Sequence, residues 1–164
     1  LIDPSEIHEI KIEEGEVVKG ISHSSNLPEH VPERQAGFAR TFLEERGYEV
    51  EIEIETTRSI STGSGITLWC GGKSGSSLGR KGKRAENVGE EAAKAIFREL
   101  ESDSNVDVYL ADQLIPYMAL SEEKSEIRVR EITGHLETNI FVCEKILGTK
   151  FIVKKNGIVN VRRI

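Results

Sequence analysis

Strict alternation of apolar and acidic residues over positions 49–55, EVEIEIE, is the feature that most constrains how this chain folds. Successive side chains of a β-strand point to opposite faces, so the segment predicts a strand with four glutamates on one face and Val50, Ile52 and Ile54 on the other. We expect the apolar face to lie on a core and the acidic face in water. A glutamate stripe can also bind cations, but a solvated face that resists edge aggregation is favoured.

Four segments carry apolar residues at the period of a helix. The first is opened by SSNLPEHVPERQ, has Pro32 in its first turn and stops at Gly47. Its predicted inner face comprises Val31, Phe38, Ala39, Phe42 and Leu43. The second segment covers about residues 85–100, with a predicted inner face of Val88, Ala92, Ala93, Ile96 and Leu100.

The third helical segment covers residues 106–120 and contains Pro116, which should end or kink it; its apolar positions are Val106, Leu110, Leu114 and Met118. The fourth runs from about residue 135 to residue 147 and stops at Gly148. Further strands are expected at residues 7–12, 16–21, 66–70, 127–132, 150–154 and 158–162, with a hairpin turn at Asn156-Gly157. The sequence thus predicts an α/β (α+β) fold, in which a smaller α/β unit precedes elements in the order β-α-α-β-α-β-β.

Composition narrows the class of protein. The 164 residues hold 28 Asp and Glu against 22 Lys and Arg, and the net charge of −6 argues against coating of nucleic acid by bulk charge. No apolar run approaches the roughly 20 residues of a membrane span and no secretion signal is visible, so no membrane partner is expected. Cys70 and Cys143 fit no zinc spacing, and we expect reduced thiols that serve packing in a cytoplasmic protein.

Residues 71–84, GGKSGSSLGRKGKR, hold five basic residues, five glycines and no acidic residue, and this composition predicts a flexible loop. Gly72-Lys73-Ser74 is like the end of a Walker A phosphate loop, but that motif requires glycine where Thr67 stands. Gly79-Arg80-Lys81-Gly82 matches the GxxG pattern with which KH domains clamp a nucleic-acid backbone. A KH loop follows a helix, whereas this one follows GGKSGSSL, so a solvated basic loop is favoured over a KH-like RNA-binding module, which is kept as an alternative. A phosphate-contacting loop in another fold ranks between these two interpretations.

His135 follows a predicted strand and the Thr133-Gly134 turn, in the first turn of the fourth helix. Backbone N–H groups and the helix dipole gather there and favour a phosphate. A neutral imidazole beside a bound phosphate is a competent nucleophile at phosphorus. Position alone still favours an ordinary cap or surface histidine, as it favours ordinary roles for His8, His23 and His30.

Tyr109, Asp112 and Gln113 are spaced i, i+3 and i+4, so one face of the third helix carries an aromatic ring, a carboxylate and an amide. Such a face can stack a base and hydrogen-bond to a ribose or to a purine edge. By spacing alone, a polar helix face with a half-buried tyrosine is the simpler interpretation.

Several segments together resemble the RNA 3′-terminal phosphate cyclases. They are SHSSNLPEHVPERQ (22–35), GSGITLW (63–69), SLGRKGKRAENVGEEAA (77–93), YLADQLIPYMAL (109–120) and EIRVREITGHLETNIFVCEKIL (126–147). They follow the order of the family and extend over nearly the whole chain. The resemblance implies a small inserted α/β domain over residues 1–60 and, over residues 61–164, the last β-α-α-β-α-β-β repeat of the large catalytic domain.

The resemblance implies an ATP-dependent enzyme of the ligase or nucleotidyltransferase type, acting in RNA processing. It would convert an RNA 3′-phosphate into a 2′,3′-cyclic phosphate through a covalent histidine–AMP intermediate. The family's HxxTN segment assigns the catalytic nucleophile to His135, with Thr138 and Asn139 completing the match. The family's nucleotide-binding stretch aligns with Tyr109, Leu110, Ala111, Asp112 and Gln113, in which Tyr109 would stack the adenine.

The resemblance also implies that the N-terminal half of the enzyme is missing from this sequence. That half carries the ligand of a divalent metal (Mg or Mn), so no metal ligand is expected here and the chain alone should not cyclise RNA. Residues 121–126 and Cys143 depart from the family pattern, at a surface loop and a packing position. The expected partners are RNA with a 3′-phosphate end, the missing half and, in a homodimer, a second copy. A catalytically silent cyclase-like ribosome-assembly factor is the alternative, against which His135 speaks.

Overall fold

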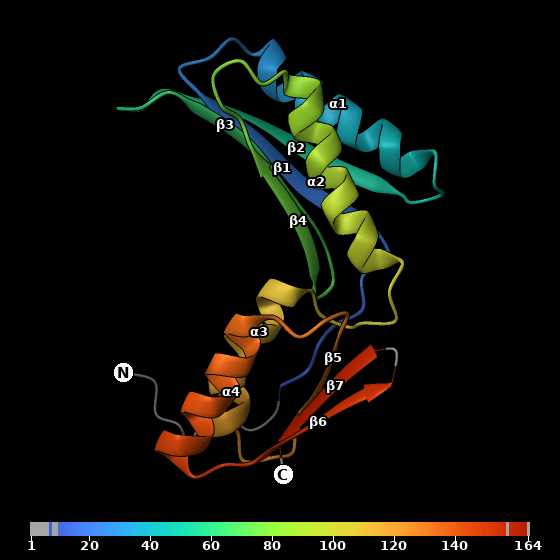
Figure 1. Ribbon diagram of the computed structural model, residues 1–164. Helices are drawn as coiled ribbons and strands as arrows, with labels where there is room; N and C mark the ends of the chain where they lie inside the picture. Colours follow the sequence, from blue (N-terminus) through green and yellow to red (C-terminus); the bar gives the residue numbers. More distant parts are fainter. Residues whose placement is uncertain (1–6, 8–9, 157, 164) are drawn as a thin grey trace. The chain divides into compact units, whose positions relative to one another are not determined.

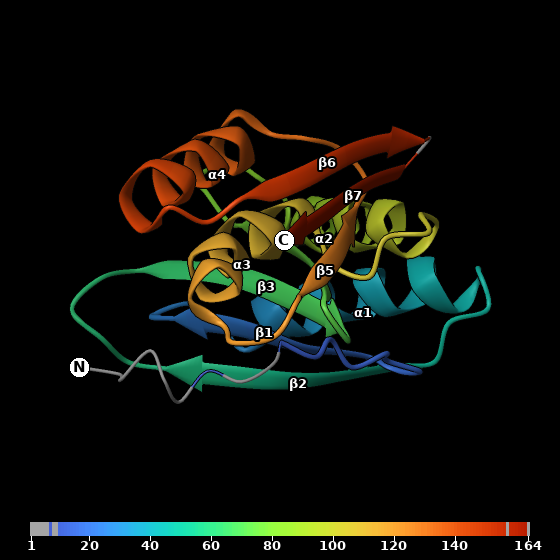
Figure 2. The same ribbon diagram turned by 90° about the horizontal axis from the view of Figure 1, so that it is seen from below.

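The computed structural model describes residues 7, 10–156 and 158–163, which form two compact units (Figures 1 and 2). One unit is the continuous segment Gly15–Glu101, and the other joins the residues before Gly15 to Ser102–Ile164. The expected boundary between residues 1–60 and 61–164 does not coincide with this division. The strand that begins at Gly63 is hydrogen-bonded to the strand that begins at Val18, and this pairing keeps both in one unit.

The unit Gly15–Glu101 is a four-stranded sheet with two helices on one face. Its elements are, in chain order, β1 (Val18–Ser25), α1 (His30–Glu44), β2 (Val50–Thr57), β3 (Gly63–Cys70), β4 (Lys73–Leu78) and α2 (Ala85–Leu100). The sheet has the order β2-β1-β3-β4, with β1 parallel to β2 and antiparallel to β3, and β4 antiparallel to β3. Figure 1 shows α1 and α2 side by side over the same face, so the unit has two layers.

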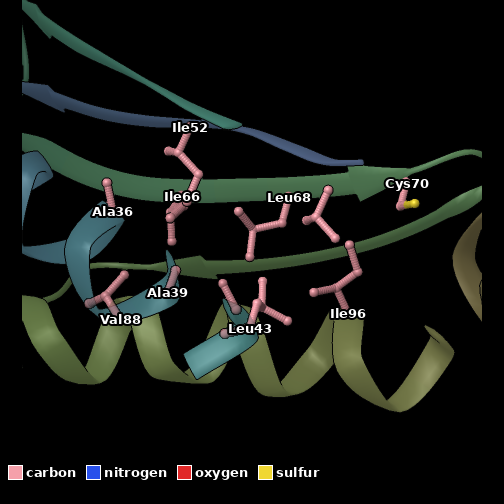
Figure 3. Close-up of a cluster of buried hydrophobic side chains, with 12 residues drawn as sticks. Ala36, Ala39, Leu43, Ile52, Ile66, Leu68, Cys70, Val88 and Ile96 are labelled. Carbon is pink, nitrogen blue, oxygen red and sulfur yellow. The ribbon is translucent and has the colours of Figure 1, made fainter. Parts of the chain in front are cut away.

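The core of this unit lies between the sheet and its two helices (Figure 3). Ile66 and Leu68 of β3 lie against Leu43 of α1 and against Val88 and Ile96 of α2, and each of the five is at most 1% exposed. The inner face predicted for the second helical segment is therefore confirmed.

Two positions of the predicted apolar faces are solvent-exposed. The predicted alternating strand is confirmed as β2, in which Ile52 is 9% exposed but Ile54 is 47% exposed. Because β2 is an edge strand, the side chains near its end have fewer neighbours. Phe38 of α1 is 50% exposed, since it lies about 100° round the helix from the fully buried Ala39.

The strand β4 occupies six residues of the predicted flexible loop at residues 71–84. The reason is the close approach of α2: a Cβ on Gly75 would lie 2.3 Å from the backbone nitrogen of Ile96 and 2.7 Å from the carbonyl oxygen of Ala92. Only glycine leaves room for a helix at that distance. The glycine and serine content of this segment therefore serves packing, and only residues 79–84 form the loop that leads into α2.

The second unit contains α3 (Val108–Leu120), β5 (Glu126–Val129), α4 (Gly134–Leu147), β6 (Phe151–Asn156) and β7 (Ile158–Arg163). Its sheet has the order β5-β7-β6, and β7 is antiparallel to both neighbours, as Figure 2 shows. Counted from β3, and with the additional β4, the elements follow the predicted order β-α-α-β-α-β-β. β6 and β7 pair antiparallel up to Asn156 and Ile158, and Gly157 of the predicted Asn156-Gly157 turn lies outside the described residues.

The ends of several elements differ from the sequence prediction. Ile7 and residues 10–12 form no strand, although Ile10 and Ile12 pack on the core of the second unit; His8 lies outside the described residues. The strand expected at residues 16–21 is β1, which starts at Val18. None of the helices in the described part of the chain has the length and hydropathy that a bilayer crossing requires.

The apolar positions predicted for the third helical segment all face the core of the second unit, and Pro116 does not end α3. Val106, which precedes the helix, and Met118 are fully buried, and the half-buried Leu110 and Leu114 pack against the same cluster. Ala111 and Ile115, which the prediction did not include, are also fully buried. The helix continues four residues beyond Pro116, to Leu120.

Candidate functional site

The start of α4 presents His135 to solvent. The Thr133 side chain caps the helix by accepting a hydrogen bond from the backbone N–H of Leu136 at 3.1 Å. His135 is the second residue of the helix and is exposed, and the Thr138 hydroxyl donates to the Gly134 carbonyl at 2.7 Å. The predicted position, directly behind a turn and in the first helical turn, is confirmed.

The predicted nucleotide-binding stretch forms the beginning of α3. Its cap is Asp107, whose carboxylate accepts hydrogen bonds from the backbone N–H groups of Tyr109 and Leu110 at 2.9 and 2.7 Å. The ring of Tyr109 is 71% exposed, Gln113 is exposed and Asp112 is half-buried. These three side chains are therefore accessible to a ligand.

The other two residues of the stretch serve the core. Ala111 is fully buried, and the half-buried Leu110 packs against the same cluster. Their side chains are not available to a ligand in this structure, so their part in any site is to hold the helix in place.

One hydrogen bond links α3 to α4. The side-chain amide of Asn139 donates to the backbone carbonyl of Asp112 at 2.8 Å. In a regular helix that carbonyl would accept from the N–H of residue 116, but Pro116 has no N–H. Asn139 therefore satisfies an acceptor that the proline leaves without its helical partner, and this contact holds the two helices together at their candidate site residues.

The arrangement places a candidate nucleophile and a candidate base-binding face on two neighbouring helices. The imidazole of His135 and the ring of Tyr109 belong to two helices that are packed together in one unit. Aromatic rings stack on nucleobases, and an imidazole can attack phosphorus. Among the described residues, no three His, Cys, Asp or Glu side chains gather into a group that could hold a metal ion.

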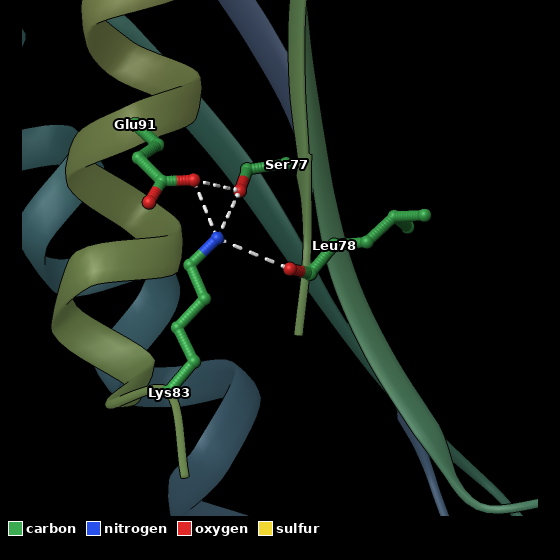
Figure 4. Close-up of polar contacts among 4 residues, drawn as sticks. All are labelled: Ser77, Leu78, Lys83 and Glu91. Atoms are coloured by element: carbon green, nitrogen blue, oxygen red, sulfur yellow. Dashed lines mark hydrogen bonds and ion pairs between the residues drawn. The ribbon is translucent and has the colours of Figure 1, made fainter. Parts of the chain in front are cut away.

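The basic loop in the other unit is anchored rather than flexible. Lys83 forms an ion pair with Glu91 and donates hydrogen bonds to the Ser77 hydroxyl at 3.0 Å and to the Leu78 carbonyl at 3.2 Å (Figure 4). The hydrogen bond from Lys83, followed by that from Ser77, lowers the pKa of the Glu91 carboxyl. The strand β4 precedes this loop, where a KH domain requires a helix, so the structure lacks the KH arrangement.

Sequence reasoning missed several of these residues. Asp107 stands directly before α3 and could have been recognised as a helix cap from its residue type. The pairing of Asn139 with a carbonyl 27 residues away has no local signal. The ion pair of Arg34 with Glu86, 52 residues apart, has none either, and its hydrogen bond lowers the pKa of the Glu86 carboxyl.

A family model and curated relatives point to the same protein family. Residues 12–101 match the family model "RNA 3′-terminal phosphate cyclase (RTC), insert domain", a range that nearly coincides with the compact unit Gly15–Glu101. Three curated relatives carry the name RNA 3′-terminal phosphate cyclase. That of Archaeoglobus fulgidus is 51% identical over 87% of this chain and 43% of its own length, and that of Methanosarcina mazei is 51% identical over 89% and 42%. That of Methanococcoides burtonii is 49% identical over 98% and 49%.

The chain thus spans less than half the length of these relatives. The match of the insert-domain model covers more than half of the chain, and the similarity to the relatives continues through most of the second unit. The chain belongs to the RNA 3′-terminal phosphate cyclase family.

Proposed function

We propose that the complete protein to which this chain contributes converts RNA 3′-terminal phosphates into 2′,3′-cyclic phosphates at the expense of ATP, with His135 as the nucleophile. The observation that carries the proposal is the exposed His135 in the first turn of α4, on a helix that Asn139 ties to α3. A histidine placed there has its ring open to a substrate and backbone N–H groups beside it that favour phosphate oxygens.

Three transfer steps follow from this assignment. The imidazole attacks the α-phosphorus of ATP, a P–N bond forms, and pyrophosphate leaves. An oxygen of the RNA 3′-phosphate then attacks the same phosphorus, which breaks the P–N bond and returns the free histidine. Finally the neighbouring 2′-OH attacks the RNA phosphorus, loses its proton and expels AMP, and the cyclic phosphate remains.

α3 would hold the adenosine of ATP in the first step. The exposed ring of Tyr109 offers a stacking surface, and the side chains of Asp112 and Gln113 offer an acceptor and an amide for the sugar and the base edge. The described residues contain no group suited to a divalent metal, so none of these steps is assigned to a metal held by this chain.

The remaining part of the protein would supply further groups and cover exposed apolar surface. Val142 and Ile146 lie one turn apart on α4 and are 41% and 75% exposed, and large apolar side chains exposed together on a helix mark an interface. Experiments on activity should therefore use the complete protein.

The test of the nucleophile is covalent labelling. The complete protein is incubated without RNA, with a divalent metal salt and ATP labelled at the α-phosphate. We expect acid-labile, protein-bound label in the wild type and in His30→Ala, an exposed histidine in the other unit that serves as matched control. His135→Ala should carry none, and retention of label by this variant would show that the assignment of His135 is wrong.

The test of the base-binding face uses two tyrosines of the same helix. Tyr109→Ala should raise the KM for ATP about tenfold, because stacking on a base contributes about 1–3 kcal/mol. Tyr117→Ala, 49% exposed on α3, is the matched control and should leave the KM unchanged. A wild-type protein that neither accepts label nor cyclises a 3′-phosphorylated RNA would contradict the proposed function and leave the catalytically silent ribosome-assembly factor as the alternative.

A further inference from the structure

The unit Gly15–Glu101 contains a second candidate site, a cavity of about 620 Å³ at one end of its helix layer. Five basic residues line it: Arg34 of α1, Arg80, Lys81 and Lys83 of the loop after β4, and Arg84 at the start of α2. We call this cavity the basic pocket. None of the described residues that line it is acidic, although the chain as a whole carries a net charge of −6.

Two carboxylates next to the basic pocket neutralise part of its charge. Glu86 pairs with Arg34 and lies 3.5 Å from Arg84, and Glu91 pairs with Lys83. Five cations and two carboxylates leave a formal excess of three positive charges around one cavity. An ion-pair network that only stabilised the fold would not require that excess, so the pocket is suited to an anion with several negative charges.

The ion pairs of these two carboxylates are with Arg34, Lys83 and Arg84 rather than with Arg80 and Lys81, although the charge of Arg80 contributes to the lowered pKa of Glu91. Arg80 and Lys81 are both exposed, and they occupy the first two positions of a turn in which the Lys83 N–H donates to the Arg80 carbonyl at 3.0 Å. Gly82 has a φ of +83°, as the third position of a type II turn requires. The loop therefore has a defined turn conformation, and this turn presents the side chains of Arg80 and Lys81 at the rim of the pocket.

The framework behind these cations is rigid. The Gly79 N–H donates to the Ser64 carbonyl at 2.9 Å, which fixes the loop to the start of β3. The fully buried Gln35 donates to the Ser64 hydroxyl at 2.9 Å and accepts from Ser22 at 3.1 Å, which fixes α1 to β1 and β3. Lys83 links β4 to α2, because it donates a hydrogen bond to Ser77 and forms an ion pair with Glu91 (Figure 4). A site whose walls are already ordered loses little conformational entropy when a ligand binds.

The lining of the basic pocket is also suited to a ligand that carries a base or sugar in addition to its phosphate. Leu27, Val31 and Val88 add apolar surface, and the guanidinium planes of arginine stack on bases as well as bind phosphate. A volume of about 620 Å³ lies in the range of pockets that hold nucleotide-sized ligands.

We propose that the basic pocket binds the internal backbone phosphates of a single-stranded RNA, with Arg80 and Lys81 as phosphate contacts. This inference rests on the proposed function, because it assigns the pocket to the body of the RNA whose 3′ end is modified elsewhere. It gives the unit Gly15–Glu101 a role in holding the substrate that is separate from the attack on ATP.

The experiment measures RNA binding and AMP transfer separately in the complete protein. The probe is a fluorescent RNA of about 16 nucleotides with a 3′-OH, which is long enough for the site sizes of about 4–16 nucleotides found in single-strand-binding folds. Arg80→Glu combined with Lys81→Glu is compared with Lys19→Glu combined with Arg98→Glu. The control makes the same change of charge at exposed residues of the same unit outside the pocket. Unfolding in urea, followed by circular dichroism, verifies that both variants fold.

The expected magnitude follows from counterion release. Each phosphate contact to a single strand contributes about 0.7 to the slope of log affinity against log salt, so loss of two contacts lowers the slope by about 1.4 and the affinity about 25-fold at 0.1 M salt. The control should lose less than about threefold, since distant charges are screened. Formation of protein-bound AMP in the absence of RNA should be unchanged in both variants.

Two results would overturn the proposal. One is an RNA affinity that falls equally in the pocket variant and in the control. The other is a loss of AMP transfer in the pocket variant with RNA binding intact, because the pocket would then hold the phosphates of ATP. A wild-type protein that forms no AMP adduct contradicts the proposed function alone, and a selective loss of RNA affinity in the pocket variant would still support the RNA site.

Discussion

Replacement of Gly89 by alanine is predicted to destabilise the unit Gly15–Glu101, although alanine is the better helix former. Gly89 lies in α2 where this helix crosses α1, and a Cβ there would lie 2.1 Å from the backbone carbonyl oxygen of Gln35. Gly37 of α1 is the matched control, because a Cβ at that position meets nothing within 4 Å.

The two substitutions share one energy term and differ in another. Each gains about 0.8–1.0 kcal/mol of helix propensity. At position 89 the helices must separate by about 1 Å, and overpacking against backbone, which cannot rotate away, costs about 3 kcal/mol. Gly37→Ala should therefore stabilise the unit by about 0.9 kcal/mol, and Gly89→Ala should destabilise it by about 2 kcal/mol.

The fluorescence of Trp69 allows the stability of the unit Gly15–Glu101 to be measured separately. Trp69 is the single tryptophan of the chain and lies in β3, so its fluorescence during urea unfolding reports on this unit. With a slope of about 1.5 kcal/mol/M, the midpoint should rise by about 0.6 M for Gly37→Ala and fall by about 1.3 M for Gly89→Ala. Equal shifts in the two variants, or a higher midpoint for Gly89→Ala, would refute the close contact between α1 and α2.

Three further predictions concern other contacts. The pKa of Glu91 is lowered from its usual 4.5 by its lysine partner, so its stabilising effect is present above that value and is lost as the pH falls through the lowered pKa. The difference in urea midpoint between wild type and Glu91→Gln should therefore be present at pH 7 and vanish well below pH 4.5. Burial raises the pKa of both Cys70 and Cys143, so both thiols should react slowly with iodoacetamide until urea unfolds the chain. Asn139→Ala should lower the free energy of unfolding of the second unit by about 1 kcal/mol, measured by circular dichroism. In a Pro116→Ala background the same substitution should have a clearly smaller effect, because residue 116 then supplies its own N–H donor.

The elements with strong periodicity were predictable. The residues from Val88 to Ile96 carry their pattern in one continuous segment, and every position of the predicted face from Val88 to Ile96 is buried. β4 was missed for a physical reason. Its inward positions are Gly75, where the backbone of α2 approaches closely, and Ser77, which is hydrogen-bonded to Lys83, so no apolar alternation marks it as a strand.

The positions of the candidate site residues on their helices were predictable from the sequence, but the contacts between the two helices were not. A strand, a turn and a helix in succession place His135 in a first helical turn, and the i, i+3, i+4 spacing places Tyr109 and Asp112 on one helix. The hydrogen bond from Asn139 depends on how two helices pack, which local patterns do not encode. The basic pocket likewise needs Arg34, which lies 45 positions before the loop residues and is brought to them by the fold.

Pro116 has a consequence for the order in which the candidate site becomes structured. An isolated α3 would keep an unpaired carbonyl at Asp112, so its middle turn is weakened until α4 arrives with Asn139. The face that carries Tyr109 and the helix that carries the histidine thus depend on each other for their final form. A conformer in which α4 has come away would lack the candidate nucleophile and would also have a weakened turn behind the candidate base-binding face, so the two halves of the candidate site are energetically coupled.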